Sequence, residues 1–358
     1  MKTILLLIVL LSGPGLVETS SAQEFIKGVD ATMLTAVERQ GGTFSSSGQR
    51  ADALAILRSK GVNAIRLRLF VDPSGQDALV CNLAYVLPLA QRVKGAGMQF
   101  LLDLHYSDSW ADPGKQTKPR AWTSLGWTAL QARVRDYTRE AVSELTAAGA
   151  SPDYVQIGNE INGGMLWPEG KTADAEGWKR FAELVRAGTE GARSGLGPGA
   201  RVRFIHHIAT PKNVVWHLEN FLANGGEIDL IGISWYPVDQ GSFPDFRANL
   251  LEIANRYHKD IVIAETAYPW TTRNFDAHNN VLKASNPAAG MPSYTPQGQA
   301  EFMEKLLSSL RAVPGGHGLG FFWWEATWLP SAPIGSPTDN TNLFDEKGAA
   351  LPALDALR

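Results

Sequence analysis

The stretch LAYVLPLAQRVKGAGMQFLLDLH, residues 83–105, decides the fold. Apolar residues recur at helical spacing up to Gly97, where glycine ends the helix, and an apolar strand follows at once. A strand that is apolar along its whole length and follows a helix is typical of a parallel sheet covered on both faces. We therefore expect a helix over residues 83–97 and a strand over residues 98–105.

The same helix–strand unit recurs from Phe25 to the C-terminus, with no low-complexity linker between the copies. The predicted strands cover residues 25–31, 63–70, 98–105, 154–160, 202–209, 228–235, 261–265 and 318–325. The predicted helices cover residues 51–61, 83–97, 125–148, 178–195, 213–224, 248–258 and 298–313, with a short last helix near Leu351. Eight such units favour an α/β fold of the (β/α)8 TIM-barrel type, as a single domain, over an open doubly wound sheet. The doubly wound alternative is weaker because GGHGLG, residues 315–320, precedes a strand instead of following one.

The N-terminal segment, residues 1–22, predicts a secretory signal peptide. It contains one lysine, an apolar run over residues 4–11 and small residues up to Ala22. We expect cleavage near Ala22, export to the periplasm or the medium, and a catalytic domain over residues 23–358. The alternative is a short apolar N-terminal helix. No other segment is long and apolar enough to span a membrane.

Charge and cysteine content exclude several classes of partner. The chain has 33 Lys and Arg against 36 Asp and Glu, a formal net charge of -3, and both signs are spread along it. This pattern offers no basic stripe for nucleic acid and no polybasic patch for a membrane. Cys81 is the single cysteine, so an internal disulfide and a thiolate metal cluster are excluded, and we interpret it as a packing residue. We expect a monomer with a neutral or small partner.

Two acids stand where predicted strands end. Asn159 and Glu160 end the fourth strand, and Glu265 ends the seventh, IVIAE. In a barrel the strand ends meet at one rim, where the active site forms. A pair of carboxylates at a partly desolvated rim suits glycoside hydrolysis, in which one acid protonates the leaving oxygen and the other acts on the anomeric carbon. Spacing does not decide which is which, and either acid alone could be an ordinary solvent-facing residue.

Aromatic residues crowd the same predicted rim. They are Trp110, Trp122, Trp127, Trp167, Trp235, Tyr236, Tyr268, Trp270, Trp323, Trp324 and Trp328. Flat apolar rings suit the C–H faces of uncharged sugars. Some of these rings are expected to fill the core, with Trp122 and Trp127 the first candidates.

These motifs resemble a known family. QIGNE (156–160) and IAETAYPW (263–270) are similar to the motifs of clan A retaining glycosidases. More narrowly, the chain resembles the family 53 glycoside hydrolases, the arabinogalactan endo-β-1,4-galactanases, from about Gly28 to the C-terminus. The pieces that carry this resemblance are GVDAT, IRLRLFVDP, LDLHYSDSWADPGKQTKPRAW, QIGNEINGGMLWP, IGISWYP, IAETAYPW and FFWWEATW. HYSDSWADPGKQ is the most specific of them.

The resemblance implies roles for individual residues. Glu160 is expected to be the acid/base and Glu265 the nucleophile of a retaining reaction. Arg68, the inner member of RLR, is expected to hold Glu265 ionised. The remaining expected substrate-binding residues are His105, Asp108, Trp110, Asp112, Asn159, His206, Tyr236 and Trp324. His206 is the weaker case, because either His206 or His207 could face inward and a core histidine is an equal alternative.

The resemblance also implies a structural calcium ion, while the chemistry itself needs no cofactor. The long loop after the seventh strand contains NFDAHNN, and SPTD follows near the C-terminus. The expected ligands are Asn274, Asp276, His278, Asn280, Ser336 and Asp339. Oxygen ligands suit a hard cation. The alternative is a turn-rich loop held by side-chain hydrogen bonds.

The expected substrate is β-1,4-galactan, the side chain of pectin, together with galacto-oligosaccharides. A second hypothesis keeps the barrel and the acids but changes the sugar to a β-mannan or β-glucan. A third is a non-catalytic galactan-binding protein of the cell surface. The intact pair of Glu160 and Glu265 argues against the third.

Overall fold

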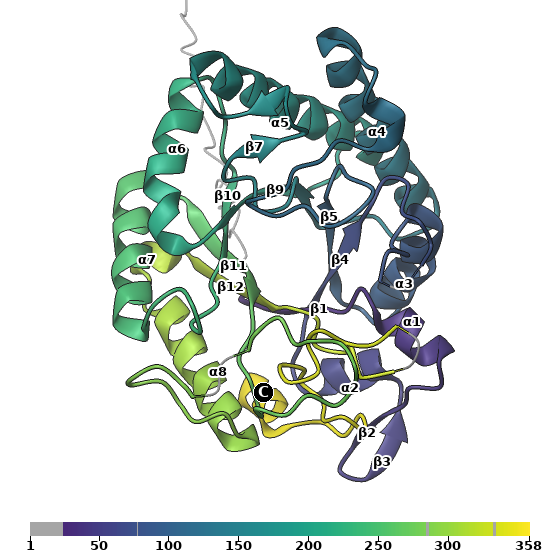
Figure 1. Ribbon diagram of the computed structural model, residues 1–358, viewed down its shortest axis with the longest axis vertical. Coiled ribbons are helices and arrows are strands. Elements are labelled where there is room, and N and C mark those ends of the chain that lie inside the picture. Colours follow the sequence, from purple (N-terminus) through teal and green to yellow (C-terminus); the bar gives the residue numbers. More distant parts are fainter. Residues whose placement is uncertain (1–23, 77, 284–285, 332–333) are drawn as a thin grey trace, which may run out of the picture.

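Eight parallel strands close a barrel in the order β1-β12-β11-β10-β9-β6-β5-β4 (Figure 1). The computed structural model describes residues 24–358 apart from 77, 284–285 and 332–333, so the predicted signal peptide lies outside the described residues. The barrel strands are β1 (Ile26–Asp30), β4 (Ala64–Leu69), β5 (Gln99–Leu104), β6 (Tyr154–Ile157), β9 (Arg203–Ala209), β10 (Leu230–Ser234), β11 (Asp260–Thr266) and β12 (Gly318–Trp323). The predicted TIM barrel is confirmed, and each predicted strand coincides with a barrel strand.

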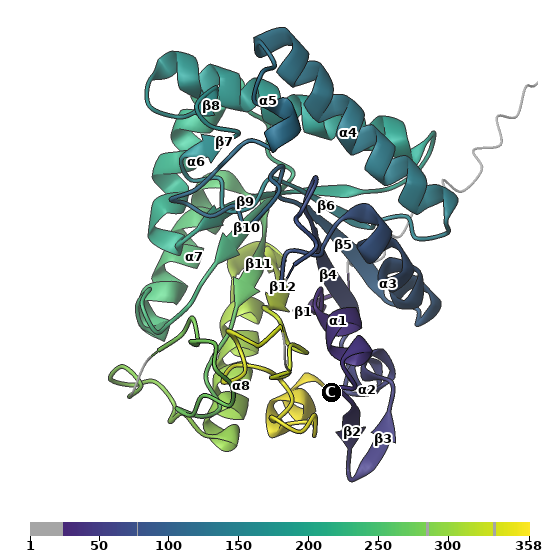
Figure 2. The ribbon, with the colours of Figure 1, turned by 45° about the vertical axis from the view of Figure 1, so that its right-hand side comes forward.

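Helices form the outer ring around this barrel (Figures 1 and 2). They are α1 (Leu34–Arg39), α2 (Ala53–Ser59), α3 (Leu83–Gly95), α4 (Trp127–Ala147), α5 (Ala175–Leu196), α6 (Val214–Ala223), α7 (Phe243–Tyr257) and α8 (Pro296–Arg311). Short 3-10 turns are η1 (Arg120–Trp122), η2 (Pro211–Asn213), η3 (Pro314–Gly316) and η4 (Pro352–Leu357). No helix within the described residues is both long and apolar enough to cross a bilayer.

Some elements were not predicted from the sequence because they are short or begin at polar residues. Two small hairpins, β2–β3 (Phe44–Ser46 with Gln49–Ala51) and β7–β8 (Gly164–Met165 with Gly170–Lys171), lie outside the barrel. Helix α7 begins at Phe243 instead of residue 248. Ser242 and Asp245 form a capping box there, with each side chain accepting from the other residue's backbone N–H, and this extends the helix past its apolar pattern.

The core has two layers that leave the upper barrel for polar residues. The lower interior of the barrel is filled by apolar side chains contributed by the strands: Ile26, Ala64, Leu101, Tyr154, Ile205, Leu230, Val262, Leu319 and Phe322. A second and larger layer packs the outward strand faces against the helices. Charged side chains therefore gather above the apolar floor, at the carboxyl ends of the strands.

Backbone irregularities at the strand ends aim the polar side chains. Gly158 has φ +82° directly after β6, and a Cβ there would lie 2.6 Å from Cγ2 of Ile161. Glu160 follows with φ +46°, an uncommon conformation for a residue with a side chain. The ladder between β10 and β11 shifts register between Ile233 and Ser234, so that Ser234 stands opposite Glu265. Such a bulge re-aims a side chain at the rim of a barrel.

Candidate active site

A cavity of about 370 Å³ opens at the carboxyl ends of the barrel strands. Its lining combines carboxylates, arginines and aromatic rings: Arg66, Arg68, His105, Trp110, Ala111, Asp112, Asn159, Glu160, Tyr236, Asp239, Gln240, Glu265, Val281, Leu282 and Trp324. Both predicted acids are among them. A concave site in which convergent polar groups meet aromatic walls is typical of a small-molecule or sugar site.

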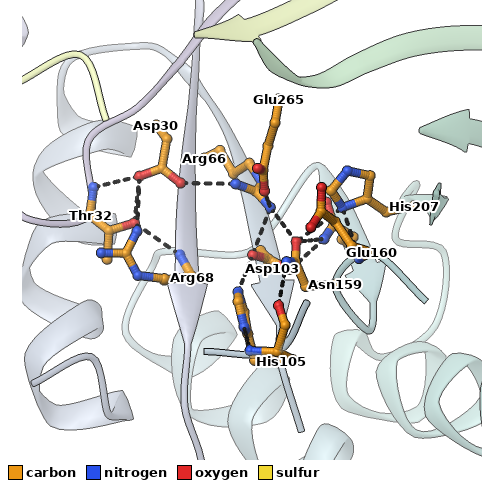
Figure 3. A network of polar contacts seen from close by, with 12 residues as sticks. Asp30, Thr32, Arg66, Arg68, Asp103, His105, Asn159, Glu160, His207 and Glu265 are labelled. Carbon is orange, nitrogen blue, oxygen red and sulfur yellow. Dashed lines mark hydrogen bonds and ion pairs between the residues drawn. The ribbon is translucent and has the colours of Figure 1, made fainter. Parts of the chain in front are cut away.

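Glu265 is held from two sides. Nη2 of Arg66, on β4, lies 2.7 Å from Oε1 of Glu265, and the Tyr236 hydroxyl donates to Oε2 at 2.9 Å. Arg66 also bonds Asp103 at 2.8 Å and Asp30 at 3.1 Å, so one buried guanidinium serves three carboxylates (Figure 3). Both oxygens of Glu265 therefore accept hydrogen bonds from fixed donors, which favours its ionised form.

The prediction that Arg68 holds Glu265 is wrong. Arg68 instead pairs with Glu325, which follows β12, and lies 3.7 Å from Asp30. Arg66 and Arg68 are two residues apart and share the inner face of β4, so strand alternation cannot separate them. Because β1 separates β4 from β12, Arg68 reaches across β1 to Glu325, while the Arg66 guanidinium reaches β11.

Glu160 lies in a different environment, in which no arginine of the described residues bonds its carboxylate directly. Its Oε1 accepts a hydrogen bond from the Ser234 hydroxyl at 2.6 Å. The amide of Asn159 is fixed beside it, since Nδ2 donates to the Ala111 carbonyl at 2.9 Å and Oδ1 accepts from Arg66 at 2.9 Å. Figure 3 shows the side chains of Glu160 and Glu265 directed toward each other.

These environments give the two acids different pKa values. Burial and then the facing charge of Glu265 raise the pKa of Glu160 to about 8, although the Ser234 hydroxyl lowers it. Burial also raises the pKa of Glu265, but the Arg66 charge and the Tyr236 hydroxyl oppose this rise. Glu265 is therefore the acid that ionises first, and Glu160 keeps its proton near neutral pH. Two carboxyl groups pushed apart in this way can act as nucleophile and proton donor.

Aromatic rings form one wall of the cavity. Trp110 packs edge-on against Trp324, with ring centres 6.4 Å apart, and the Arg68 guanidinium lies over the Trp110 ring, 4.1 Å from its centre. His105 supports this wall: Nε2 lies 2.9 Å from Asp103, and Nδ1 accepts from the Ala111 N–H at 3.1 Å. Trp122, Trp235, Trp323 and Trp328 are instead buried, with at most 3% of their surface exposed.

Asp112 lies at the cavity, but two other predicted substrate-binding residues do not. The carboxylate of Asp108 accepts from the backbone N–H groups of Asp72 and Arg120, so it fixes loops away from the cavity. His206 faces outward from β9, where its ring stacks on Phe221 with centres 4.2 Å apart. His207 is the inward histidine. The correction for His206 concerns which face of a strand a side chain takes, and that for Asp108 concerns the path of a loop. Residue type alone determines neither.

The six predicted calcium ligands lie in two loops that contact each other. Asp276 accepts from the backbone N–H groups of His278 at 2.7 Å and Ser336 at 2.6 Å. Asp339 accepts from the Phe275 N–H through Oδ2, while its buried Oδ1 has no hydrogen-bond donor among the described residues. The Oδ1 atom of Asn280 is also buried and has no donor within the described ranges, and the Asn280 side chain lies against Asp339.

Two unpartnered oxygens fit a hard cation, which takes oxygen ligands. The other predicted ligands are used within the loops. Nδ2 of Asn274 donates to the His278 carbonyl at 2.9 Å, and the His278 side chain is exposed. Among the described residues, no three His, Cys, Asp or Glu side chains are grouped so that they could hold a metal. The residues therefore fit calcium in part, through Asn280 and Asp339.

Several residues of the site were not predicted to have a role. Asp103 and Gln156 are polar residues inside buried strands, and Gln156 donates to Asp103 at 2.5 Å. Gln116 donates to the Asn159 carbonyl at 2.8 Å. Ser234 and His207 contact Glu160 directly. A polar residue in an otherwise apolar strand was the available signal for Asp103 and Gln156, because such groups are buried only with partners.

Comparison with known proteins agrees with this geometry. The profile of glycosyl hydrolase family 53 matches residues 26–357. An arabinogalactan endo-beta-1,4-galactanase from Cellvibrio japonicus is 33% identical and covers 92% of this chain and 89% of its own. A GH53 catalytic domain from Ignisphaera aggregans superposes with a TM-score of 0.88 at 36% identity, covering 94% of this chain and 96% of that one.

A further solved structure, one of two fungal beta-1,4-galactanases, gives a TM-score of 0.81 at 29% identity over 94% of this chain and 99% of its own. The family profile spans nearly the whole described barrel, including Glu160 and Glu265. The chain belongs to glycosyl hydrolase family 53 and is a glycoside hydrolase.

Proposed function

We propose that the protein is an endo-β-1,4-galactanase that cleaves galactan by a retaining double displacement. The observation that carries the proposal is the pairing of Glu265, held by Arg66 and Tyr236, with Glu160, whose pKa is raised to about 8, in one cavity. The relatives named as galactanases support the choice of sugar.

In the first step Glu265 attacks the anomeric carbon while Glu160 gives its proton to the departing glycosidic oxygen. This forms a galactosyl ester on Glu265 and releases the leaving sugar with its new hydroxyl. In the second step the ionised Glu160 takes a proton from water, and the water oxygen displaces Glu265 from the anomeric carbon. The enzyme returns to its starting protonation state, and the product keeps the β configuration.

Endo-action is supported by a second cavity of about 410 Å³ beside the first. Trp110, Val281 and Trp324 line both cavities, so the two are continuous along one wall. The second cavity is also lined by Trp328 and Ile334. A chain of several sugars can extend from the reacting position over these apolar surfaces, which suits internal cleavage of a polymer.

The first test is reducing-end release from linear β-1,4-galactan, with β-mannan and a soluble cellulose derivative beside it. The wild-type protein is expected to cleave galactan alone, and Glu265→Gln is expected to be nearly inactive on it. Glu160→Ala should lose activity on galactan and regain turnover of an activated aryl galactoside when azide, which needs no general base, attacks the galactosyl ester in place of water and forms the galactosyl azide. Cleavage of mannan or cellulose instead would overturn the substrate, and full activity of Glu265→Gln would overturn the mechanism.

We further propose that a calcium ion joins the loops that carry Asn280 and Asp339. Their unpartnered buried oxygens support this, and binding to the folded state alone would raise stability. Added EGTA should lower the melting temperature of the wild type and leave Asp339→Asn less affected. An unchanged melting temperature with EGTA and with excess calcium would exclude the site.

Export is a third proposal, supported by the apolar run and small residues of segment 1–22. N-terminal sequencing of the protein recovered outside the cytoplasm should begin at Gln23. Retention of Met1 in that fraction would contradict cleavage.

A further inference from the structure

Glu160, His207 and Ser234 form a closed ring of hydrogen bonds. The backbone N–H of Glu160 points to Nδ1 of His207 at 3.3 Å. Nε2 of His207 lies 2.8 Å from Oγ of Ser234, and that hydroxyl lies 2.6 Å from Oε1 of Glu160. His207 and Ser234 are fully buried, so water does not compete for these contacts. The left-handed φ of Glu160 lets its backbone and its side chain reach the two ends of one ring.

The direction of the ring depends on which nitrogen of His207 carries the proton. Nδ1 of His207 also lies 3.0 Å from Oδ1 of Asn159, and that oxygen cannot donate. A proton on Nδ1 would bond Asn159 but leave the N–H of Glu160 without its acceptor. A proton on Nε2 lets Nδ1 accept from Glu160 and lets Nε2 donate to Ser234.

The Asn159 side chain does not need the histidine as a donor. Its Oδ1 lies 2.9 Å from Nη2 of Arg66 and 3.1 Å from Nε2 of Gln156, so a donor other than the histidine is available to it. The Nε2–H form of His207 therefore leaves no group of the ring unpaired. Burial, the Arg66 charge and the His105 ring lower the pKa of His207 well below its usual value, against Asp103, so one nitrogen alone carries a proton.

The Nε2–H form fixes the hydroxyl of Ser234. Because Oγ accepts from His207, its own hydrogen is free to donate to Oε1 of Glu160. Oε1 is then an acceptor whether Glu160 is protonated or ionised. Within the described part of the chain no group bonds Oε2, which belongs to a residue that lines the cavity.

We propose that His207 and Ser234 are positioning residues that keep Oε1 an acceptor and so hold the proton of Glu160 on Oε2, the oxygen that serves the leaving group. This inference rests on the proposed role of Glu160 as acid/base. The same bond steadies the carboxylate after its proton has gone to the glycosidic oxygen. Neither residue was assigned a role from the sequence.

Other titratable groups also face Glu160 and His207 and act on their ionisation. They are Glu265 on β11, Arg66 on β4, Asp112 in the loop after β5, and Tyr236 after β10, while Asp103 and His105 face His207. Of the ring members, Ser234 lowers the pKa of Glu160. Loss of its hydroxyl should therefore move the deprotonation of Glu160 to higher pH.

The first experiment compares Ser234→Ala with Ser234→Thr on aryl β-1,4-galactobiosides whose leaving phenols differ in acidity. Ser234→Ala should lower kcat/KM about tenfold for poor leaving groups and little for activated ones, because only the former need the proton. The alkaline limb of its kcat/KM–pH profile should move to higher pH. Ser234→Thr keeps the hydroxyl and should restore both the rate with poor leaving groups and the position of the alkaline limb. A general structural disturbance of the site would instead lower the rates for all leaving groups equally and leave the alkaline limb in place.

His206→Gln is the matched control, since His206 is the neighbouring buried histidine that faces outward. It should leave the leaving-group dependence and the alkaline limb unchanged. A shift in His206→Gln equal to that of Ser234→Ala, or an unshifted Ser234→Ala, would overturn the inference.

The second experiment reads the tautomer directly by nitrogen-15 NMR of the seven histidines, with His207→Gln identifying the signal. A proton on Nε2 at neutral pH is expected, and a proton on Nδ1 overturns the inference. The proposed function is tested separately by Glu160→Ala. If azide rescues Glu160→Ala while Ser234→Ala behaves as wild type, the positioning role of His207 and Ser234 is refuted and the acid/base role of Glu160 stands. If Glu160→Ala keeps full activity on galactan, the role of Glu160 itself fails.

Discussion

Nη2 of Arg66 lies 2.7 Å from Oε1 of Glu265, so a guanidinium on β4 holds the acid of β11 across the barrel. The same guanidinium bonds Asp30 and Asp103. A buried cation shared among three carboxylates cannot be removed without leaving an unpaired buried charge. Arg66 is therefore the main group that opposes the effect of burial on Glu265 and favours its ionised form.

Arg66→Lys should therefore reduce kcat/KM about 100-fold or more, because an ammonium group cannot make the forked contacts of a guanidinium. Arg66 lowers the pKa of Glu265, so the weaker contact of a lysine should leave that pKa higher. Since Glu265 must be ionised to attack, the acid limb of the pH profile should move to higher pH. Arg68→Lys, on the same strand, is the control and should leave the acid limb in place. The opposite pattern would contradict the assignment of Arg66.

Glu160 should set the alkaline limb of the reaction. Its pKa is raised to about 8 by burial and by the facing Glu265, and its protonated form is the one that assists departure of the leaving group. Activity on galactan should therefore fall as pH rises through about 8. Measurement of kcat/KM across pH 5–10 tests this expectation. A limb near the ordinary value of a glutamic acid, about 4.3, would refute it.

The same group should make folding stability depend on pH. A carboxyl whose pKa is raised in the folded state stabilises the fold below its unfolded pKa, and this contribution is lost as pH rises through the folded value near 8. Between those limits the wild type should lose up to about 1.4 kcal/mol of unfolding free energy per pH unit relative to Glu160→Gln. Urea unfolding of both proteins at several pH values measures the difference. Parallel curves would show that Glu160 does not titrate in this range.

Trp110 should contribute to sugar binding more than to chemistry. Its ring lines both cavities and lies over Arg68 at 4.1 Å. Trp110→Ala should raise KM for galactan about tenfold, with a smaller change in kcat, since a stacked ring binds ground state and transition state alike. Trp110→Phe keeps a ring and should recover part of the affinity. A loss confined to kcat would instead place Trp110 in the chemical step.

Much of the fold could be read from the chain because the signals are local. Each barrel strand is a short apolar run, and each is followed by helical periodicity. The residue at which each helix begins is harder to predict. Helix α7 begins at Phe243 because Ser242 and Asp245 cap each other, which an apolar pattern does not reveal. The hairpins β2–β3 and β7–β8 are too short to leave a periodic trace.

The site was read less completely. The two glutamates were found because an acid directly after an apolar strand is conspicuous, and the cavity contains both. The sequence predicts Arg68 as the partner of Glu265 and leaves open whether His206 or His207 faces inward, whereas the structure has Arg66 on Glu265 and His207 inside. A strand that is apolar on both faces shows no alternation of apolar and polar residues. The sequence therefore does not show which of two neighbouring histidines faces the inside of the barrel.

The sequence alone determined the eightfold strand–helix repeat and the two carboxyl groups at strand ends, since periodicity and strand termini are properties of neighbouring residues. Only the tertiary structure decided that Arg66 faces Glu265, that Arg68 faces Glu325, and that His207 and Ser234 close a ring on Glu160. These contacts join strands far apart in the chain. They depend on how closure of the barrel aligns the strands across its axis, and on burial, which gives each charge its energy.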